Sequence, residues 1–153
     1  MKLTVGTAAP GSDGWTTLDL VGADICNPMW ATGVPYGTAE EVRCIHALEH
    51  IPRDRVEPAL REFYRVLRPG GVLTLEVPTL AYVCSQWLEY RDHWGLQLLF
   101  GLQDRPGQFH LTGFDAHSLR KAVELAEFVV DAEQREWSFE QWSIRLAGHR
   151  PLR

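Results

Sequence analysis

Several side chains that can act as acids, bases or hydrogen-bond acceptors lie at the edges of predicted secondary structure. His46, Glu49 and His50 follow a strand predicted at residues 41–45, and His110 precedes a predicted helix. His110 is the best candidate for a general base, because it lies between a flexible segment and that helix. A structural role is the alternative for each: the histidines can satisfy local backbone groups, and Glu49 can cap a helix or form a surface pair. No Cys, Ser or Asp stands in a convincing nucleophile arrangement.

A glycine and an aspartate lie at the ends of the first two predicted strands. Gly6 follows the short strand at residues 2–5, and Asp19 lies near the end of the strand at residues 16–20. A glycine lets the backbone turn tightly and approach a ligand closely. A carboxylate at a strand end can accept hydrogen bonds from a ligand, but Asp19 taken alone is interpreted more simply as a solvated strand end.

The most regular element is a helix predicted over residues 52–67. Apolar residues recur there at helical spacing, with acidic residues early and arginines late, as the helix dipole favours. Pro69-Gly70-Gly71 ends this helix, and the apolar run at residues 72–77 predicts a buried strand. A strand, helix and strand in this order predict a βαβ unit, with parallel strands and helices packed on a sheet.

The end of the chain predicts further elements of the same sheet. Residues 80–90 and 118–126 are predicted helices, and Asp115 is predicted to cap the second one. Two final strands at residues 128–132 and 142–146 are predicted to form an antiparallel pair at one edge of the sheet.

The length of 153 residues fits a single α/β domain spanning residues 1–153. We see no internal repeat and no linker. Residues 91–112 mix apolar residues with glycines and a proline, which indicates a lid or an insertion within that domain.

The composition excludes several classes of protein. Apolar residues at 45% and charged residues at 23% argue against disorder. A formal net charge of −5 without a basic run gives no footprint for a phosphate backbone, so nucleic acid is not an expected partner. No apolar stretch approaches the roughly 20 residues of a membrane helix, and no signal-peptide pattern is present, so we expect a cytoplasmic protein without a membrane contact.

The cysteines and tryptophans suggest packing more than chemistry. Cys26, Cys44 and Cys84 are widely spaced and odd in number, which favours reduced core thiols over disulfides or a zinc site, and we expect no metal site. Six tryptophans suit either a packed core or an apolar surface for a partner subunit, so a homo-oligomer is compatible with the sequence.

Residues 46–51 and 59–71 resemble the class I S-adenosylmethionine-dependent methyltransferase family. The specific part is Arg-Val-Leu-Arg-Pro-Gly-Gly at residues 65–71 with Leu-Glu-His upstream. The likeness is to a compact subgroup that opens with a strand, a Gly-Cys-Gly loop and a Gly-Trp pair. The corresponding residues here are Leu3 to Ala8, Gly14-Trp15, Leu18-Asp19 and, for the family's late segment, Thr112 to Asp115 with the helix after it. The resemblance implies a Rossmann-like sheet, mostly parallel with an antiparallel edge.

The resemblance also implies a site for S-adenosylmethionine at the carboxyl ends of the parallel strands, where open α/β sheets bind ligands. Gly6 and the loop of Thr7 and Ala8 would lie against the methionine part of the cofactor. Asp19 would accept hydrogen bonds from the two ribose hydroxyls. Asn27 is the nearest match to the residue that contacts adenine, and His46 would lie beside the cofactor.

Two features depart from the family pattern. The glycine loop reads Gly6-Thr7-Ala8-Ala9, so an alanine methyl replaces one glycine. A third short strand is predicted at residues 23–26. Few residues separate the first predicted strand from the second, and almost none separate the second from this third one, so we expect the helices near the N-terminus to be missing or rudimentary. Without the first of them the cofactor would lose helix N-terminal amides, which predicts weak binding.

Two functions follow from these observations. The first is transfer of the methyl group of S-adenosylmethionine to an oxygen, nitrogen or carbon of a small-molecule or glycan-like acceptor. The second is a catalytically inactive methyltransferase-like domain that acts as a binding or assembly module. The altered glycine loop favours the second, whereas Asp19 and the intact Leu-Glu-His segment favour the first.

Overall fold

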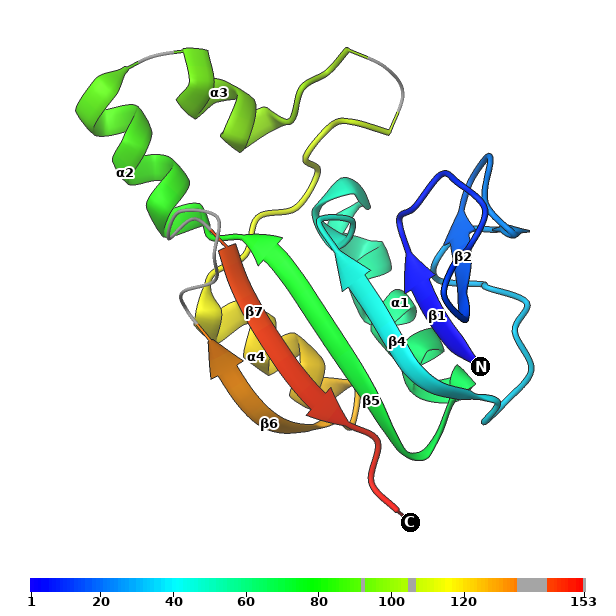
Figure 1. The fold of residues 1–153 in the computed structure, drawn as a ribbon. Helices are drawn as coiled ribbons and strands as arrows, with labels where there is room; N and C mark the ends of the chain where they lie inside the picture. The colour runs from blue at the N-terminus through cyan, green and yellow to red at the C-terminus, as the bar shows by residue number, and fades with distance from the viewer. Residues whose placement is uncertain (92, 105–106, 135–142, 153) are drawn as a thin grey trace.

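The computed structural model describes residues 1–91, 93–104, 107–134 and 143–152 and places them around one seven-stranded sheet (Figure 1). The strand order is β3-β2-β1-β4-β5-β7-β6. The strands are β1 (Lys2–Val5), β2 (Trp15–Asp19), β3 (Ile25–Cys26), β4 (Ala39–Ile45), β5 (Leu67–Pro78), β6 (Val129–Gln134) and β7 (Ser143–His149). The helices are the 3-10 helix η1 (Leu48–His50) and the α-helices α1 (Arg53–Val66), α2 (Leu80–Tyr90), α3 (His93–Phe100) and α4 (Ala116–Leu125).

The pairing of the strands confirms the predicted fold class. Strands β1 to β5 pair parallel with one another, whereas β7 pairs antiparallel with both β5 and β6. Residue 142, where the last strand was predicted to begin, lies outside the described residues, and β7 is described from Ser143. The sheet is therefore Rossmann-like, mostly parallel, with an antiparallel edge.

The β4-α1-β5 unit forms the centre of the core. The residues of α1 that repeat at helical spacing are buried against the sheet; they are Val56, Ala59, Leu60, Phe63 and Val66. The helix ends before Pro69, as the sequence predicts. Strand β5 begins at Leu67, earlier than predicted, because Leu67 already pairs with Ala39 ahead of a register shift in β4.

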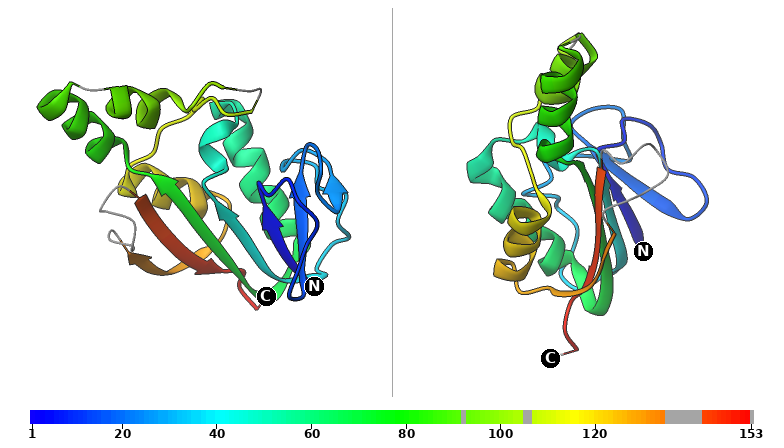
Figure 2. Two further views of the ribbon diagram at one scale, coloured as in Figure 1. Left: turned by 45° about the horizontal axis from the view of Figure 1, so that its top comes forward. Right: turned by 90° about the vertical axis from the view of Figure 1, so that its left-hand side faces the viewer.

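The two faces of the sheet differ. Helices α1 and α4 lie side by side on one face (Figure 2). On the other face, Lys2 and Arg43 pair with Glu41 at 3.6 and 2.9 Å, and the Arg43 guanidinium lies 4.1 Å from the centre of the Trp15 ring. This face therefore carries charges that pair with one another at the surface.

The chain between the first three strands forms no helix, as the departures from the family pattern predict. Residues 6–14 and 20–24, all of them described, form turns and irregular backbone. Helix α2 lies before the expected lid or insertion at residues 91–112, and α3 forms residues 93–100 of it. Both helices extend beyond the carboxyl end of β5 (Figure 1). None of the described helices is long and apolar enough to cross a bilayer.

Two expectations about burial need correction. Cys44 is buried, and burial raises the pKa of its thiol, but Cys26 and Cys84 are exposed because one ends the short edge strand β3 and the other faces outward on α2. Glu49, expected at the surface, is only 2% exposed, because the chain before α4 covers it. Asp115 caps α4 as predicted, with its carboxylate accepting from the Ser118 amide at 2.7 Å.

Candidate functional site

The residues expected around a cofactor lie at one edge of the sheet. Because β1 to β4 are parallel neighbours, their carboxyl ends meet at the same edge. Gly6 follows β1, Asp19 ends β2, Asn27 follows β3 and His46 follows β4. The topology thus brings all four positions to the edge at which ligands bind in open α/β sheets.

Gly6 lies where the backbone leaves no room for a side chain. Its φ is +84°, and a Cβ placed on it would lie 2.3 Å from the Cβ of Ala47. Its amide donates to the Leu18 carbonyl at 2.8 Å. Thr7 and Ala8, which follow it, are exposed. Glycine is required here by packing against the segment after β4 as well as by the turn.

The loop after Gly6 is held by hydrogen bonds that the sequence analysis did not foresee. The Asp24 carboxylate accepts from the Gly11 and Thr17 amides, both at 3.0 Å. These backbone hydrogen bonds lower the pKa of Asp24. The Thr17 hydroxyl donates to the Ala9 carbonyl at 2.6 Å. Asp24 and Thr17 thus hold in place a loop at the position where the family pattern has a helix.

Asp19 keeps one carboxylate oxygen available at the end of β2. Its carboxylate is half-buried, and Oδ1 accepts from the Leu20 amide at 2.6 Å. In the described part of the chain no donor reaches Oδ2, which is therefore free to accept a hydrogen bond.

Asn27 has a structural contact, because its Nδ2 donates to the Thr32 carbonyl at 2.9 Å and closes the following loop.

His46 lies between two carboxylates. Its φ is +49°, its Nε2 lies 3.1 Å from Glu76 Oε1, and its Nδ1 lies 3.6 Å from Glu49 Oε1. Burial disfavours the charged ring, but the hydrogen bonds and negative charges of Glu49 and Glu76 outweigh it, so the pKa of His46 is raised. The His46 ring is thus fixed in place next to the expected cofactor edge.

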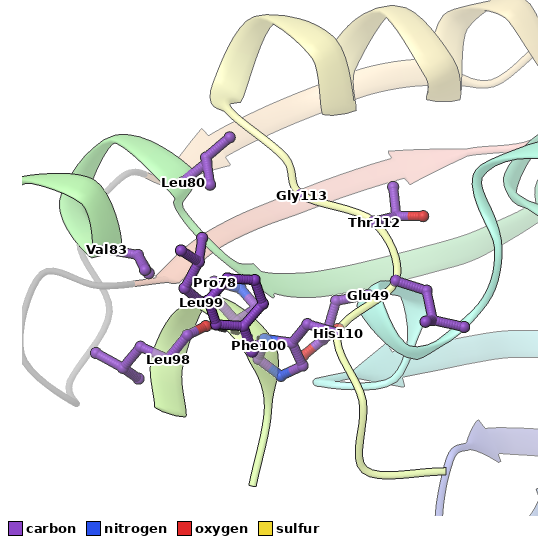
Figure 3. A pocket seen from close by; sticks show the side chains of 11 residues that line it. Glu49, Pro78, Leu80, Val83, Leu98, Leu99, Phe100, His110, Thr112 and Gly113 are labelled. Atoms are coloured by element: carbon purple, nitrogen blue, oxygen red, sulfur yellow. Dashed lines mark hydrogen bonds between the residues drawn. The ribbon is translucent and has the colours of Figure 1, made fainter. Parts of the chain in front are cut away.

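A pocket of about 220 Å³ opens beyond this edge (Figure 3). Its walls are mostly apolar and come from the end of β5, from α2 and α3, and from the chain before α4. Glu49 and His110 supply the ionisable groups of its lining. The apolar lining residues are Pro78, Leu80, Val83, Leu98, Leu99, Phe100 and Leu111. His110, the candidate base, is part of this lining. The apolar walls could not be predicted from the sequence, because those residues face one another only through the α2–α3 packing.

The environment of His110 in this pocket favours the neutral form of its ring. Burial lowers its pKa, and the nearby His50 ring lowers it further against the opposing charge of Glu49. Its Nδ1 lies 2.9 Å from the Leu98 carbonyl. Because a carbonyl oxygen only accepts, Nδ1 carries the proton and Nε2 presents a lone pair. Nε2 is therefore the ring nitrogen that can accept a proton.

The contact between Glu49 and His110 depends on two segments that are far apart in the sequence. The Leu111 and Thr112 amides donate to the Glu49 carbonyl at 2.8 and 3.1 Å, and the Thr112 hydroxyl donates to the Ile51 carbonyl at 2.8 Å. No local sequence pattern indicates this docking. The one available signal is that Glu49 stands between Leu48 and Ile51, two apolar residues that are buried.

Comparisons with known proteins agree with this architecture. A methyltransferase domain family matches residues 12–133. Among curated proteins, none matches the sequence significantly. A methyltransferase from Methanosarcina mazei described as S-adenosylmethionine-dependent superposes with a TM-score of 0.68 at 14% identity, covering 99% of this chain and 92% of that one.

Two further structures show the same fold. A chain of the complex between the Haloferax volcanii Trm112 methyltransferase activator and a methyltransferase gives a TM-score of 0.67 at 13% identity, over 97% of this chain and 81% of that one. The 1,6-didemethyltoxoflavin-N1-methyltransferase of Burkholderia thailandensis, with 1,6-didemethyltoxoflavin and S-adenosylhomocysteine bound, gives a TM-score of 0.62 at 13% identity, over 97% of this chain and 71% of that one. With the family match spanning most of the sequence and this sheet order, the chain belongs to the class I methyltransferases, whose methyl donor is S-adenosylmethionine.

Proposed function

We propose that this protein transfers the methyl group of S-adenosylmethionine to a small molecule bound in the pocket beside His110. The observation that carries the proposal is the position of this pocket. It lies past the ends of β4 and β5, next to His46 at the cofactor edge, and Glu49 and His110 are its ionisable lining residues. Its apolar walls favour an acceptor with an apolar body over a glycan.

The cofactor residues are assigned by position. The backbone of Gly6, Thr7 and Ala8 lies against the methionine part, Asp19 Oδ2 accepts from the ribose hydroxyls, and Asn27 lies beside the adenine. His46 lies at the boundary between the cofactor and the acceptor pocket. S-adenosylmethionine, when bound, supplies a methyl group activated by its positive sulfur.

His110 is the proposed base in this arrangement. Methyl transfer requires alignment of the methyl group with the acceptor atom, and a base only when that atom must lose a proton. The lowered pKa of His110 keeps the ring neutral near neutral pH, so Nε2 can take a proton from an acceptor hydroxyl or amine. The family match gives no support to the catalytically inactive alternative.

Calorimetric titration of S-adenosylmethionine and S-adenosylhomocysteine tests the cofactor assignment. Asp19→Ala is expected to weaken binding by about 1 kcal/mol or more, the scale of a lost hydrogen bond to a charged group. Asp13→Asn, which changes an acid in the nearby loop without a side-chain hydrogen bond in the described structure, is the control and is expected to bind as the wild type does. Absence of heat up to roughly millimolar ligand contradicts the proposal.

A filled pocket tests the acceptor assignment separately. In Leu99→Trp the larger side chain occupies the pocket, so transfer of labelled methyl to members of a small-molecule library is expected to fall, with cofactor affinity unchanged. Equal transfer by the wild type and Leu99→Trp would place the acceptor elsewhere.

A further inference from the structure

Glu49, His50 and His110 form a cluster of potential metal ligands beside the pocket. One nitrogen or oxygen atom from each side chain lies within 4.8 Å of those of the other two. The His50 and His110 rings meet edge to face, with centroids 4.9 Å apart. The hydrogen bonds of Leu111 and Thr112 to the Glu49 carbonyl fix the two segments against each other. The cluster is therefore positioned by the fold, and it does not depend on the chance orientation of surface side chains.

Each imidazole has one ring nitrogen held by a backbone carbonyl. His50 Nδ1 lies 3.0 Å from the Phe109 carbonyl, and His110 Nδ1 lies 2.9 Å from the Leu98 carbonyl. Each carbonyl requires a proton on the nitrogen that faces it, so each neutral ring presents the lone pair of Nε2. A ligating histidine commonly donates its other ring proton to a backbone carbonyl in this way, which fixes both its tautomer and its orientation.

Glu49 carries a buried carboxylate oxygen without a partner. The residue is 2% exposed, and no donor among the described residues reaches Oε2. Burying a carboxylate oxygen without a hydrogen bond or a cation is unfavourable. The two imidazoles cannot relieve this cost while each keeps its proton on Nδ1, because Nε2 then has no proton to donate. A cation among the three groups would satisfy the carboxylate and both lone pairs together.

We propose that Glu49, His50 and His110 bind a divalent first-row transition metal ion. Two imidazoles and one carboxylate suit Zn²⁺, Fe²⁺, Co²⁺ or Mn²⁺, whereas Mg²⁺ and Ca²⁺ prefer oxygen ligands throughout. Glu49 and His110 both line the pocket, so an ion held by them would lie beside the proposed acceptor site. An ion bound to His110 Nε2 would prevent that nitrogen from taking the acceptor's proton. It would instead lower the pKa of a coordinated acceptor hydroxyl, whose proton would pass to solvent water.

The test is titration of the chelator-treated full-length protein with Zn²⁺ alone, in a Cys26→Ser/Cys84→Ser background that removes the exposed thiols. We expect binding of one ion per chain. His50→Ala and Glu49→Gln should each weaken that binding by at least about tenfold. His117→Ala removes an exposed imidazole of α4 outside the cluster and is the matched control, expected to bind as the background protein does.

Thermal unfolding is a second measurement of Zn²⁺ binding, and it also shows whether each variant is folded, because only a folded protein has an unfolding transition. Zn²⁺ should raise the unfolding temperature of the background protein and of His117→Ala but not that of Glu49→Gln. Circular dichroism of Glu49→Gln and His50→Ala without metal checks that each variant is folded, because Glu49→Gln also removes the ion pair with His46 at 3.6 Å. Absence of Zn²⁺ binding, or binding retained in both His50→Ala and Glu49→Gln, overturns the proposal. Neither result depends on S-adenosylmethionine, so the failure of this site and the failure of methyl transfer are separable.

Discussion

Residues 1–38 and 39–78 are neighbouring parts of one sheet held by different interactions. In residues 39–78, α1 buries a continuous apolar stripe between β4 and β5. In residues 1–38, where no described helix forms, the loops are held by polar side chains of Asp24, Asn27 and Thr32 bonded to backbone or to α1. The cofactor edge therefore depends on a few polar contacts, whereas the centre of the molecule depends on burial.

The largest expected effect is on residues 39–78. Phe63 is fully buried on α1, and Phe63→Ala should lower the unfolding free energy by about 3–5 kcal/mol, because a cavity remains at the centre of the core. Phe100→Ala, at a site 51% exposed, should cost much less. Urea unfolding of both variants measures the difference, and equal losses would contradict the account of the core.

Gly6→Ala should cause the next largest loss of unfolding free energy, because Gly6 packs against Ala47 where residues 1–38 meet residues 39–78. The added methyl group would meet Ala47 at 2.3 Å, which adds about 1–3 kcal/mol of overpacking to the cost of a positive φ. Gly14→Ala is the matched control, since its φ is +81° and no atom lies within 4 Å of the added Cβ. Urea unfolding of the pair isolates the clash; similar values would show that the segment at Ala47 yields.

Glu62 on α1 holds Thr32 of residues 1–38, and this contact should make the unfolding free energy depend on pH. It accepts from Arg65 and from the Thr32 amide and hydroxyl, and the Arg65 hydrogen bond, despite partial burial, lowers the pKa of Glu62 to about 2. A carboxyl with a lowered folded pKa stabilises the fold above its unfolded value of 4.5, and this contribution is lost as the pH falls toward 2.

Glu62→Gln should therefore lower the unfolding free energy at pH 7 by about 1 kcal/mol, a value discounted for the partial exposure of the pair. The difference from the wild type should shrink below pH 4.5. Glu57→Gln, which removes an exposed partner of Arg61 on the same helix, is the control. A difference that stays constant from pH 7 to pH 2 would contradict the assigned ion pair.

Asp24→Asn should have the smallest and most local effect. A neutral amide is a weaker acceptor than a carboxylate, so the Gly11 and Thr17 amides should exchange hydrogen faster while global stability changes little. Asp13→Asn in the same loop should leave both exchange rates unchanged. Unchanged rates in Asp24→Asn would mean that the loop is held by other contacts.

The sequence by itself determined the elements whose cause is local. Apolar spacing and the Pro69-Gly70-Gly71 stop predict α1 and β5, the short connections predict that helices are missing near the N-terminus, and Asp115 predicts the start of α4. The resemblance carried by residues 46–51 and 59–71 also predicted which strand ends carry the cofactor residues. Parallel strands bring the residues that follow them to one edge of the sheet, so these positions lie together.

The tertiary structure alone decided which groups meet. The burial of Glu49 and its proximity to His110 arise from hydrogen bonds between η1 and the chain before α4, and the pocket arises from the packing of α2 against α3. Asp24 likewise holds Gly11 across a loop. Such contacts depend on the three-dimensional path of the chain, and no periodicity in the sequence encodes which distant segment comes to lie against a given residue.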